Sequence, residues 1–117
     1  MYKATILYRQ PADRVAFEEH YWKVHVPLAA KMPGLRRWTI TRTESANGPN
    51  ESLPFCLVVE LFADDRASLF AAFSSPEGQA AAADVRSFAG DDVLYLFGTE
   101  EEVPFSGQSA EVPGDQA

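Results

Sequence analysis

The sequence predicts an α+β domain with the element order βαββαβ, in which two helices cover one face of a four-stranded antiparallel sheet. Four short segments alternate in hydrophobicity or are almost continuously apolar, as strands are. Two longer segments follow aspartates and repeat apolar residues at helical spacing. A chain of 117 residues, 46% of them hydrophobic, can form one core of ordinary size but not two. The order of these segments is that of the ferredoxin-like split βαβ motif.

The first strand and first helix are predicted within the first 30 residues. Residues 3–9 alternate and are rich in β-branched and aromatic side chains, which predicts a strand. Asp13 ends the following turn and is placed to cap a helix. The helix has an apolar stripe at spacings of four, three and four, formed by Phe17, Tyr21, Val24 and Leu28. Pro27 lacks an amide hydrogen, so we expect a kink or break near Val26.

The remaining elements follow in the same way. Residues 35–44 alternate, with one polar face, and predict the second strand. Residues 55–62 are almost continuously apolar, which is typical of a central strand. Asp64–Asp65 offers a cap for a second helix, which Ser75–Pro76 interrupts and restarts. Residues 93–97 are β-prone and predict the fourth strand.

With both helices on one face, the other face of the sheet is left bare. A second subunit is the simplest cover for an apolar sheet face of this size, which predicts a homodimer with two sheets face to face, a dimeric α/β barrel. The polar residues of the second strand leave a monomer open as the alternative. These residues are Arg37, Thr39 and Thr41.

Charge divides the chain into a domain and a tail. The formal net charge is −7, yet residues 98–117 hold five acidic residues and no basic one. We therefore expect one domain over residues 1–100 and a flexible acidic tail over residues 101–117. Nucleic acid is an unsuitable partner, because no basic cluster is present beyond Arg36–Arg37.

The sequence also argues against a membrane segment and for the cytoplasm. No apolar stretch approaches the ~20 residues that span a bilayer, and the N-terminal run is too short for a signal peptide. Cys56 is the single cysteine, so no internal disulfide can form. The seven glycines occur singly and form neither a P-loop nor a dinucleotide fingerprint, which disfavours a bound nucleotide or flavin cofactor.

His25 is the candidate catalytic residue. It lies on the same flank of the predicted helix as Tyr21, close to Pro27, and is expected to point into the cleft between helix and sheet. There it would transfer a proton or orient a ligand, although a packing role explains it as well. His20 is five residues away and about 140° around an α-helix, so we expect no shared metal. Cys56 in a strand is expected to be an apolar filler.

A planar ligand in this cleft would meet aromatic side chains. The candidate substrate-binding residues are Tyr8, Tyr21, Trp22, Trp38, Glu60 and Phe62. Core packing explains the aromatic ones equally well. Glu60 lies inside an apolar run and must reach solvent, pair with a cation such as Arg36 or Arg42, or lie beside His25. Cross-strand pairing is the preferred interpretation.

The chain resembles the EthD family of dimeric α/β-barrel proteins over roughly residues 1–100. The resemblance is carried by Phe17-x-x-x-Tyr21-Trp22-x-x-His25-x-Pro27-Leu28, followed by Pro33-Gly34-Leu35. It implies a ferredoxin-like dimer with a pocket between helices and sheet, among relatives that include cofactor-independent monooxygenases, muconolactone-type isomerases and polyketide cyclases.

Two classes of function are consistent with these observations. The first is a cofactor-independent oxidoreductase, monooxygenase-like, that acts on a small apolar or aromatic compound with His25 handling the proton; an isomerase or cyclase would use the same cleft. The second is a non-catalytic ligand-binding or accessory protein in which His25 only orients the ligand. A cleft filled by its own side chains would instead indicate a structural role.

Overall fold

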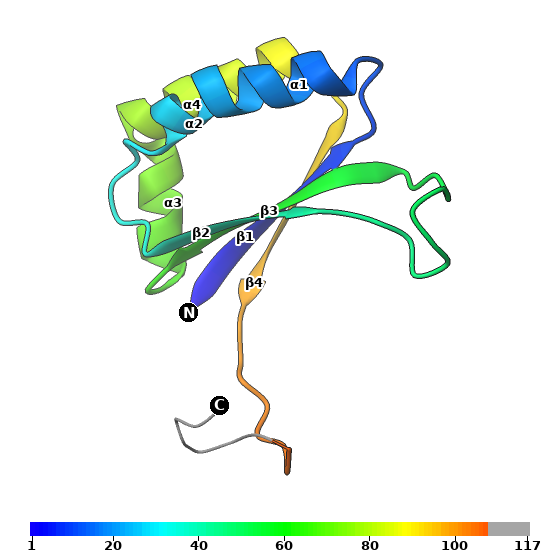
Figure 1. Ribbon diagram of the computed structural model, residues 1–117. Helices are drawn as coiled ribbons and strands as arrows, with labels where there is room; N and C mark the ends of the chain where they lie inside the picture. The colour runs from blue at the N-terminus through cyan, green and yellow to red at the C-terminus, as the bar shows by residue number, and fades with distance from the viewer. Residues whose placement is uncertain (108–117) are drawn as a thin grey trace.

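A computed structural model, which describes residues 1–107, contains a four-stranded antiparallel sheet with its helices packed on one face (Figure 1). The strands are β1 (Tyr2–Arg9), β2 (Arg37–Arg42), β3 (Phe55–Ala63) and β4 (Val93–Thr99). The helical elements are α1 (Arg14–His20), η1 (Tyr21–His25), α2 (Val26–Ala29), α3 (Arg66–Ser74) and α4 (Pro76–Phe88). The strand order is β2-β3-β1-β4, with the apolar β3 inside the sheet. The predicted fold class and element order are confirmed.

Side-chain caps start the helices where the sequence predicts them. Asp13 Oδ1 accepts a hydrogen bond from the Ala16 amide at 3.0 Å, and Asp65 Oδ1 accepts one from Ser68 at 2.8 Å. Ser75 Oγ caps α4 in the same way, with the Gly78 amide at 3.0 Å. The second helix is therefore broken into α3 and α4 at Ser75, as expected.

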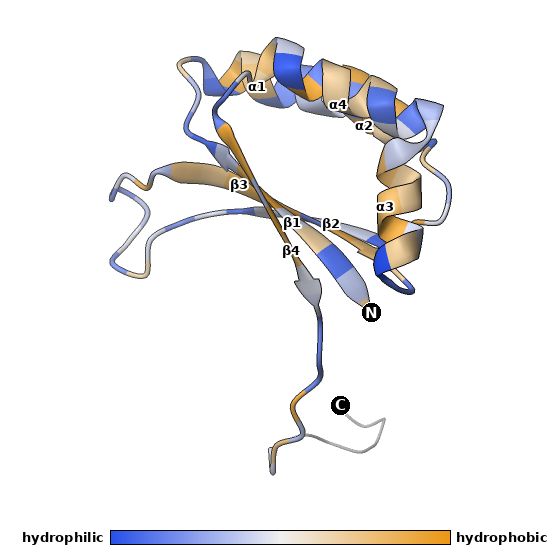
Figure 2. Cartoon of the chain, turned by 180° about the vertical axis from the view of Figure 1, so that it is seen from behind, coloured by the Kyte–Doolittle hydropathy of each residue, from blue (hydrophilic) through white to orange (hydrophobic). Residues whose placement is uncertain are grey.

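The core lies between the helices and one face of the sheet. Strand pairing places Ile6 opposite Val59 and Ala4 opposite Leu61, and all four are buried. Figure 2 shows β3 and β4 as hydrophobic along most of their length. The alternation of β1 thus gives one face to the core and the other, starting at Lys3, to the outside.

The first helical segment differs from its predicted form. The buried residues are Phe17, Tyr21, His25 and Ala29, at a constant spacing of four, while Val24 is exposed. The helix neither breaks nor ends at Pro27. Instead η1 is a π-helical turn, in which the Val26 amide donates to the carbonyl of Tyr21 five residues back. The wider turn compensates for the drift that a spacing of four has in an α-helix, so His25 replaces Val24 on the buried face.

The outer face of the sheet is part polar and part apolar. Lys3 Nζ binds Glu60 Oε2 at 2.8 Å across β1 and β3. Phe62 is buried beneath the cations of Lys3 and Arg37, with the Arg37 guanidinium 4.8 Å from the ring centre. Leu96 on β4 lies on this face and is exposed.

The segment after β4 is only partly described. The Glu100 amide donates to the carbonyl of Met1 at 2.8 Å, and residues 101–107 then continue without helix or strand. The rest of the predicted tail, residues 108–117, lies outside the described residues. In residues 1–107, none of the helices has the length and hydropathy that a membrane crossing requires.

Candidate functional site

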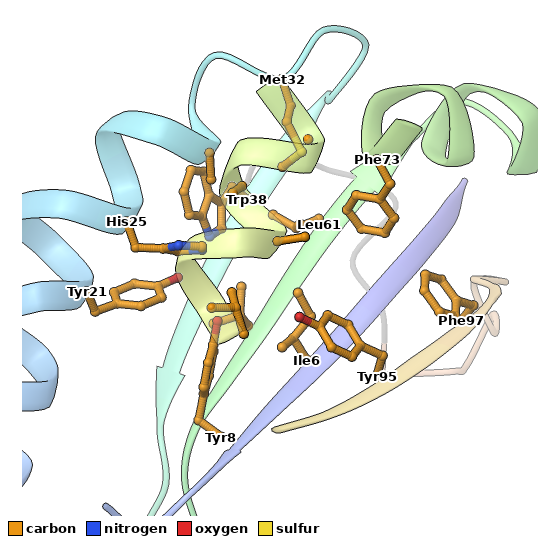
Figure 3. A pocket seen from close by; sticks show the side chains of 16 residues that line it. Ile6, Tyr8, Tyr21, His25, Met32, Trp38, Leu61, Phe73, Tyr95 and Phe97 are labelled. Carbon is orange, nitrogen blue, oxygen red and sulfur yellow. The ribbon is translucent and has the colours of Figure 1, made fainter. Parts of the chain in front are cut away.

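A cavity of about 200 Å³ lies between the helices and the inner face of the sheet (Figure 3). All four strands, η1, α2, α3 and α4 contribute to its wall. Most of the lining is apolar. The polar groups in the wall belong to His25, Trp38 and three tyrosines, which are Tyr8, Tyr21 and Tyr95. Such a cavity suits a small, largely apolar molecule with few polar atoms.

Small side chains on α4 leave the space for this cavity. Gly78, Ala81, Ala82 and Val85 all line it, and their spacing of three or four places them on one side of the helix. The alanine-rich run at 80–83 therefore has a structural consequence beyond helix propensity. It makes room opposite the large side chains of η1 and the sheet.

His25 is held in this wall by a carboxylate from α4. Its Nδ1 lies 3.1 Å from Asp84 Oδ2, and the two side chains are only 8% and 10% exposed. A carboxylate accepts hydrogen bonds, so Nδ1 carries the proton and donates it. The other ring nitrogen, Nε2, is then the basic atom, on a ring that lines the cavity. Burial lowers the pKa of His25, and Asp84 partly opposes this change.

His20 binds the same carboxylate. Its Nε2 lies 2.9 Å from Asp84 Oδ1 and 3.1 Å from Oδ2. The predicted separation of about 140° between the two histidines is wrong, because it assumes an α-helix and the π-helical turn brings residues five apart towards one side. They meet at Asp84. No cluster of histidine, cysteine and acidic residues suited to a metal is present among residues 1–107.

Three predicted aromatic residues line the cavity with His25. These are Tyr8, Tyr21 and Trp38. The ring of Tyr21 lies 5.4 Å from the imidazole of His25 and 5.9 Å from the ring of Tyr8. Burial raises the pKa of both Tyr8 and Tyr21, so their hydroxyls stay protonated and can donate hydrogen bonds. Their assignment as substrate-binding residues stays a prediction.

The other three predicted residues lie outside the cavity. Trp22 is exposed beside β2, where the guanidinium of Arg42 lies 5.9 Å from its ring. Glu60 and Phe62 are on the outer face of the sheet. Glu60 pairs across strands as preferred, but with Lys3 and not with Arg36 or Arg42. It lies on the opposite face of the sheet from His25.

Asp84 and Tyr95 are the site residues that the sequence interpretation missed. Asp84 is a single acid between Ala83 and Val85, within an otherwise apolar stretch of a helix. The same signal drew attention to Glu60 and would have drawn attention to Asp84. Tyr95 belongs to the short β4 run, and its alternation places it on the cavity face beside Ile6.

Comparison with known proteins now identifies the family. The EthD domain model matches residues 9–92. The chain belongs to the EthD family. It is also 44% identical to an uncharacterised 11.0 kDa protein of Rhodococcus erythropolis. The matched stretch of 103 residues covers 88% of this chain and 98% of the relative.

Solved structures agree with this assignment. An EthD family protein from Bacillus halodurans is 40% identical, with a TM-score of 0.80, over 86% of this chain and 99% of that one. SnoaB from Streptomyces nogalater, a cofactor-independent oxygenase, has a TM-score of 0.63 at 15% identity, over 87% of this chain and 94% of SnoaB. At that identity the likeness to SnoaB extends to the fold alone. The EthD match includes His25 and Asp84.

Proposed function

We propose that this EthD protein is a cofactor-independent enzyme that removes a proton from a small apolar or aromatic organic compound, with Nε2 of His25 as the base. One observation carries the proposal. The imidazole of His25 lines an apolar cavity while its Nδ1 is held by Asp84 at 3.1 Å. A buried carboxylate that fixes the tautomer and orientation of a histidine is a recurring arrangement in general base catalysis.

The protonation state of His25 favours this role. Burial lowers the pKa of the imidazole below its ordinary value of 6.5, so the ring is neutral near pH 7 and can accept a proton. Asp84 counteracts part of that lowering and keeps the ring basic. The imidazolium formed by proton transfer would lie beside the Asp84 carboxylate, which stabilises its charge.

The carbanion or phenolate left after proton removal allows two outcomes. In a monooxygenase-like oxidoreductase the anion reduces dioxygen, which is the only oxidant required. SnoaB is a cofactor-independent oxygenase with the same fold, which favours this version without establishing it. In an isomerase or cyclase the anion rearranges and recovers a proton, with no oxidant.

Hydrogen–deuterium exchange of 2-tetralone in D2O tests the proposal. This bicyclic ketone has acidic hydrogens next to its carbonyl, and NMR follows their loss. We expect the wild-type protein to accelerate exchange and His25→Gln to lose at least about 100-fold of that acceleration, the usual contribution of a general base. Lys23→Gln, an exposed change on the same turn, is the matched control and should exchange like the wild type.

Equal rates for wild type and His25→Gln would refute the proton-transfer role. Dioxygen uptake in the same samples separates the enzyme classes, since an oxygenase passes part of the anion on to dioxygen instead of returning it to exchange, and an isomerase or cyclase consumes no dioxygen. Binding of 2-tetralone without exchange would support the alternative of a non-catalytic binding protein.

A further inference from the structure

We propose that the Tyr21 hydroxyl and the Trp38 indole N–H together bind one oxygen atom of the ligand. The inference rests on the proposed function in placing the ligand in this cavity, and it adds the ligand's chemical class. The ligand would be a compact, mostly apolar ring compound with a carbonyl, enol or phenol oxygen next to the proton that His25 removes.

Both groups are buried polar groups without a partner. In the part of the chain from residue 1 to 107, Tyr21 Oη and Trp38 Nε1 are the two buried side-chain polar atoms that make no hydrogen bond. Tyr21 is 1% exposed. Buried donors are almost always satisfied in proteins, and an exception requires an explanation such as a binding role. A ligand acceptor in the cavity would satisfy both.

The two donors come from opposite walls and converge. Tyr21 is on η1 and Trp38 on β2, and both line the cavity. Figure 3 shows the hydroxyl of Tyr21 directed towards the indole edge of Trp38, beside His25. Trp38 also opposes the rise that burial causes in the pKa of Tyr21, so its N–H lies near the phenol oxygen. The Trp38 N–H is directed at the phenol oxygen but falls short of a hydrogen bond to it, so a ligand oxygen between the two groups can accept from both.

The chemistry of this pair selects an oxygen acceptor. Trp38 Nε1 can only donate, and Tyr21, whose pKa is raised, keeps its proton to donate. A hydrocarbon would leave both donors unpaired, and an ammonium group would place its own hydrogens against them. An oxygen that gains negative charge is favoured most, because hydrogen bonds to charged groups are the stronger ones. The arrangement corresponds to an oxyanion hole.

This pair also fits the proton step. The rings of Tyr21 and His25 lie 5.4 Å apart, so the oxygen and the base are neighbours. A C–H or O–H bond of the ligand breaks, its proton forms a bond with His25 Nε2, and the electron pair of the broken bond becomes negative charge on the oxygen between Tyr21 and Trp38. The step needs no other reactant.

Binding of 2-naphthol and naphthalene tests the inference, because the two probes share a ring system and differ in one oxygen. Fluorescence titration of each gives the preference for 2-naphthol, expressed as the ratio of the two dissociation constants. We expect the wild type to prefer 2-naphthol, and Tyr21→Phe and Trp38→Phe each to lower that preference by about 5–10-fold, the value of one hydrogen bond. The ratio removes any loss of packing common to both probes.

Tyr2→Phe and Trp22→Phe are the matched controls, since they remove the same groups outside the cavity. Both should keep the wild-type preference. All four variants retain an aromatic ring and are expected to fold, which circular dichroism checks. A wild type that binds 2-naphthol no better than naphthalene, or does not bind it at all, overturns the inference, as does an unchanged preference in Tyr21→Phe and Trp38→Phe.

This outcome is separable from that of the proposed function. His25→Gln should keep most of the preference for 2-naphthol while it loses exchange of 2-tetralone. A normal preference together with exchange that does not depend on His25 would retain the oxygen site and refute the base. A lost preference for 2-naphthol together with His25-dependent exchange would refute the oxygen site and retain His25 as the base.

Discussion

Asp84 joins two helical segments through one carboxylate. It accepts from His25 at 3.1 Å and from His20 at 2.9 Å, and it is itself largely buried. Its two neighbours differ in access to water, since the His20 side chain is 31% exposed and that of His25 only 8%. The carboxylate therefore connects the ring in the cavity wall with a ring at the surface, and its charge influences the buried base directly.

The substitution Asp84→Asn should lower the pKa of His25. Burial, the dominant influence, already lowers this pKa below 6.5, and His20 acts in the same direction; Asp84 alone opposes them. Without its charge the pKa falls further. NMR titration of the imidazole Hε1 signal measures this shift, with Glu77→Gln on the same helix as the control. A higher pKa in Asp84→Asn would contradict the role given to Asp84.

The same shift has a consequence for stability. The native pKa of His25 is lower than that of the unfolded chain, so the unfolded state binds more protons between the two values. The contribution of His25 is then complete above about pH 6.5 and decreases as the pH falls towards the native pKa. In Asp84→Asn the native pKa of His25 is lower still, so the pH range over which this contribution decreases extends further down.

At the residue scale, the sequence could predict those parts of the site that depend on local pattern. Tyr8 follows from strand alternation, and Tyr21 and His25 share a helix flank. The pairing of Asp84 with His25 follows from no local pattern, because the two residues are 59 positions apart and only packing of α4 against η1 brings them together. Phe62 was misplaced because a continuous apolar strand gives no indication of which alternate residues face the helices.

At the element scale, η1 accounts for the misplaced helix stripe. The predicted stripe used Val24 and Leu28, as an α-helix of 3.6 residues per turn requires. One π-helical turn moves the buried face to His25 and Ala29. Such a turn follows from tertiary packing. Hydrophobic periodicity does not reveal it, because the stripe with Val24 and Leu28 and the stripe with His25 and Ala29 both fit a helix. A turn of this kind often occurs at a functional site, and here it positions both histidines against Asp84.

The junction of α3 and α4 depends on Gly78. A methyl group at this position would press against the carbonyl oxygens of Ala72 and Phe73, which are backbone atoms that cannot move aside. We expect Gly78→Ala to destabilise the protein by about 1–3 kcal/mol, the usual cost of overpacking, despite the better helix propensity of alanine. Urea unfolding measures it.

Gly98→Ala is the matched control for that junction. An added methyl at Gly98 meets nothing within 4 Å, and its backbone needs no positive φ. Its free energy of unfolding should stay close to that of the wild type. Equal stability of Gly78→Ala and the wild type would show that the helix junction has more room than its geometry implies.

At the scale of the whole molecule, the apolar surface is concentrated on β4. Leu94, Tyr95, Leu96 and Phe97 are all exposed, although they alternate between the two faces of the sheet. β4 is an edge strand, with backbone groups unpaired on one side. A long apolar edge of this kind is normally covered in a native protein. Tyr95 and Phe97 also line the cavity, so whatever covers β4 would contact part of the cavity wall.

We propose that a second copy of the chain covers this region, as predicted from the bare sheet face. Leu96 on the outer face is 50% exposed, so Leu96→Lys places a charge in the proposed interface. Light scattering after gel filtration should give twice the 12.9 kDa chain mass for the wild type and the single mass for Leu96→Lys.

Val15→Lys is the matched control, because Val15 is 80% exposed on α1, away from the sheet. It should remain a dimer. A monomeric wild type would instead favour the solvent-exposed role of Arg37, Thr39 and Thr41, and would leave the two cavity-lining residues of β4, Tyr95 and Phe97, exposed to water.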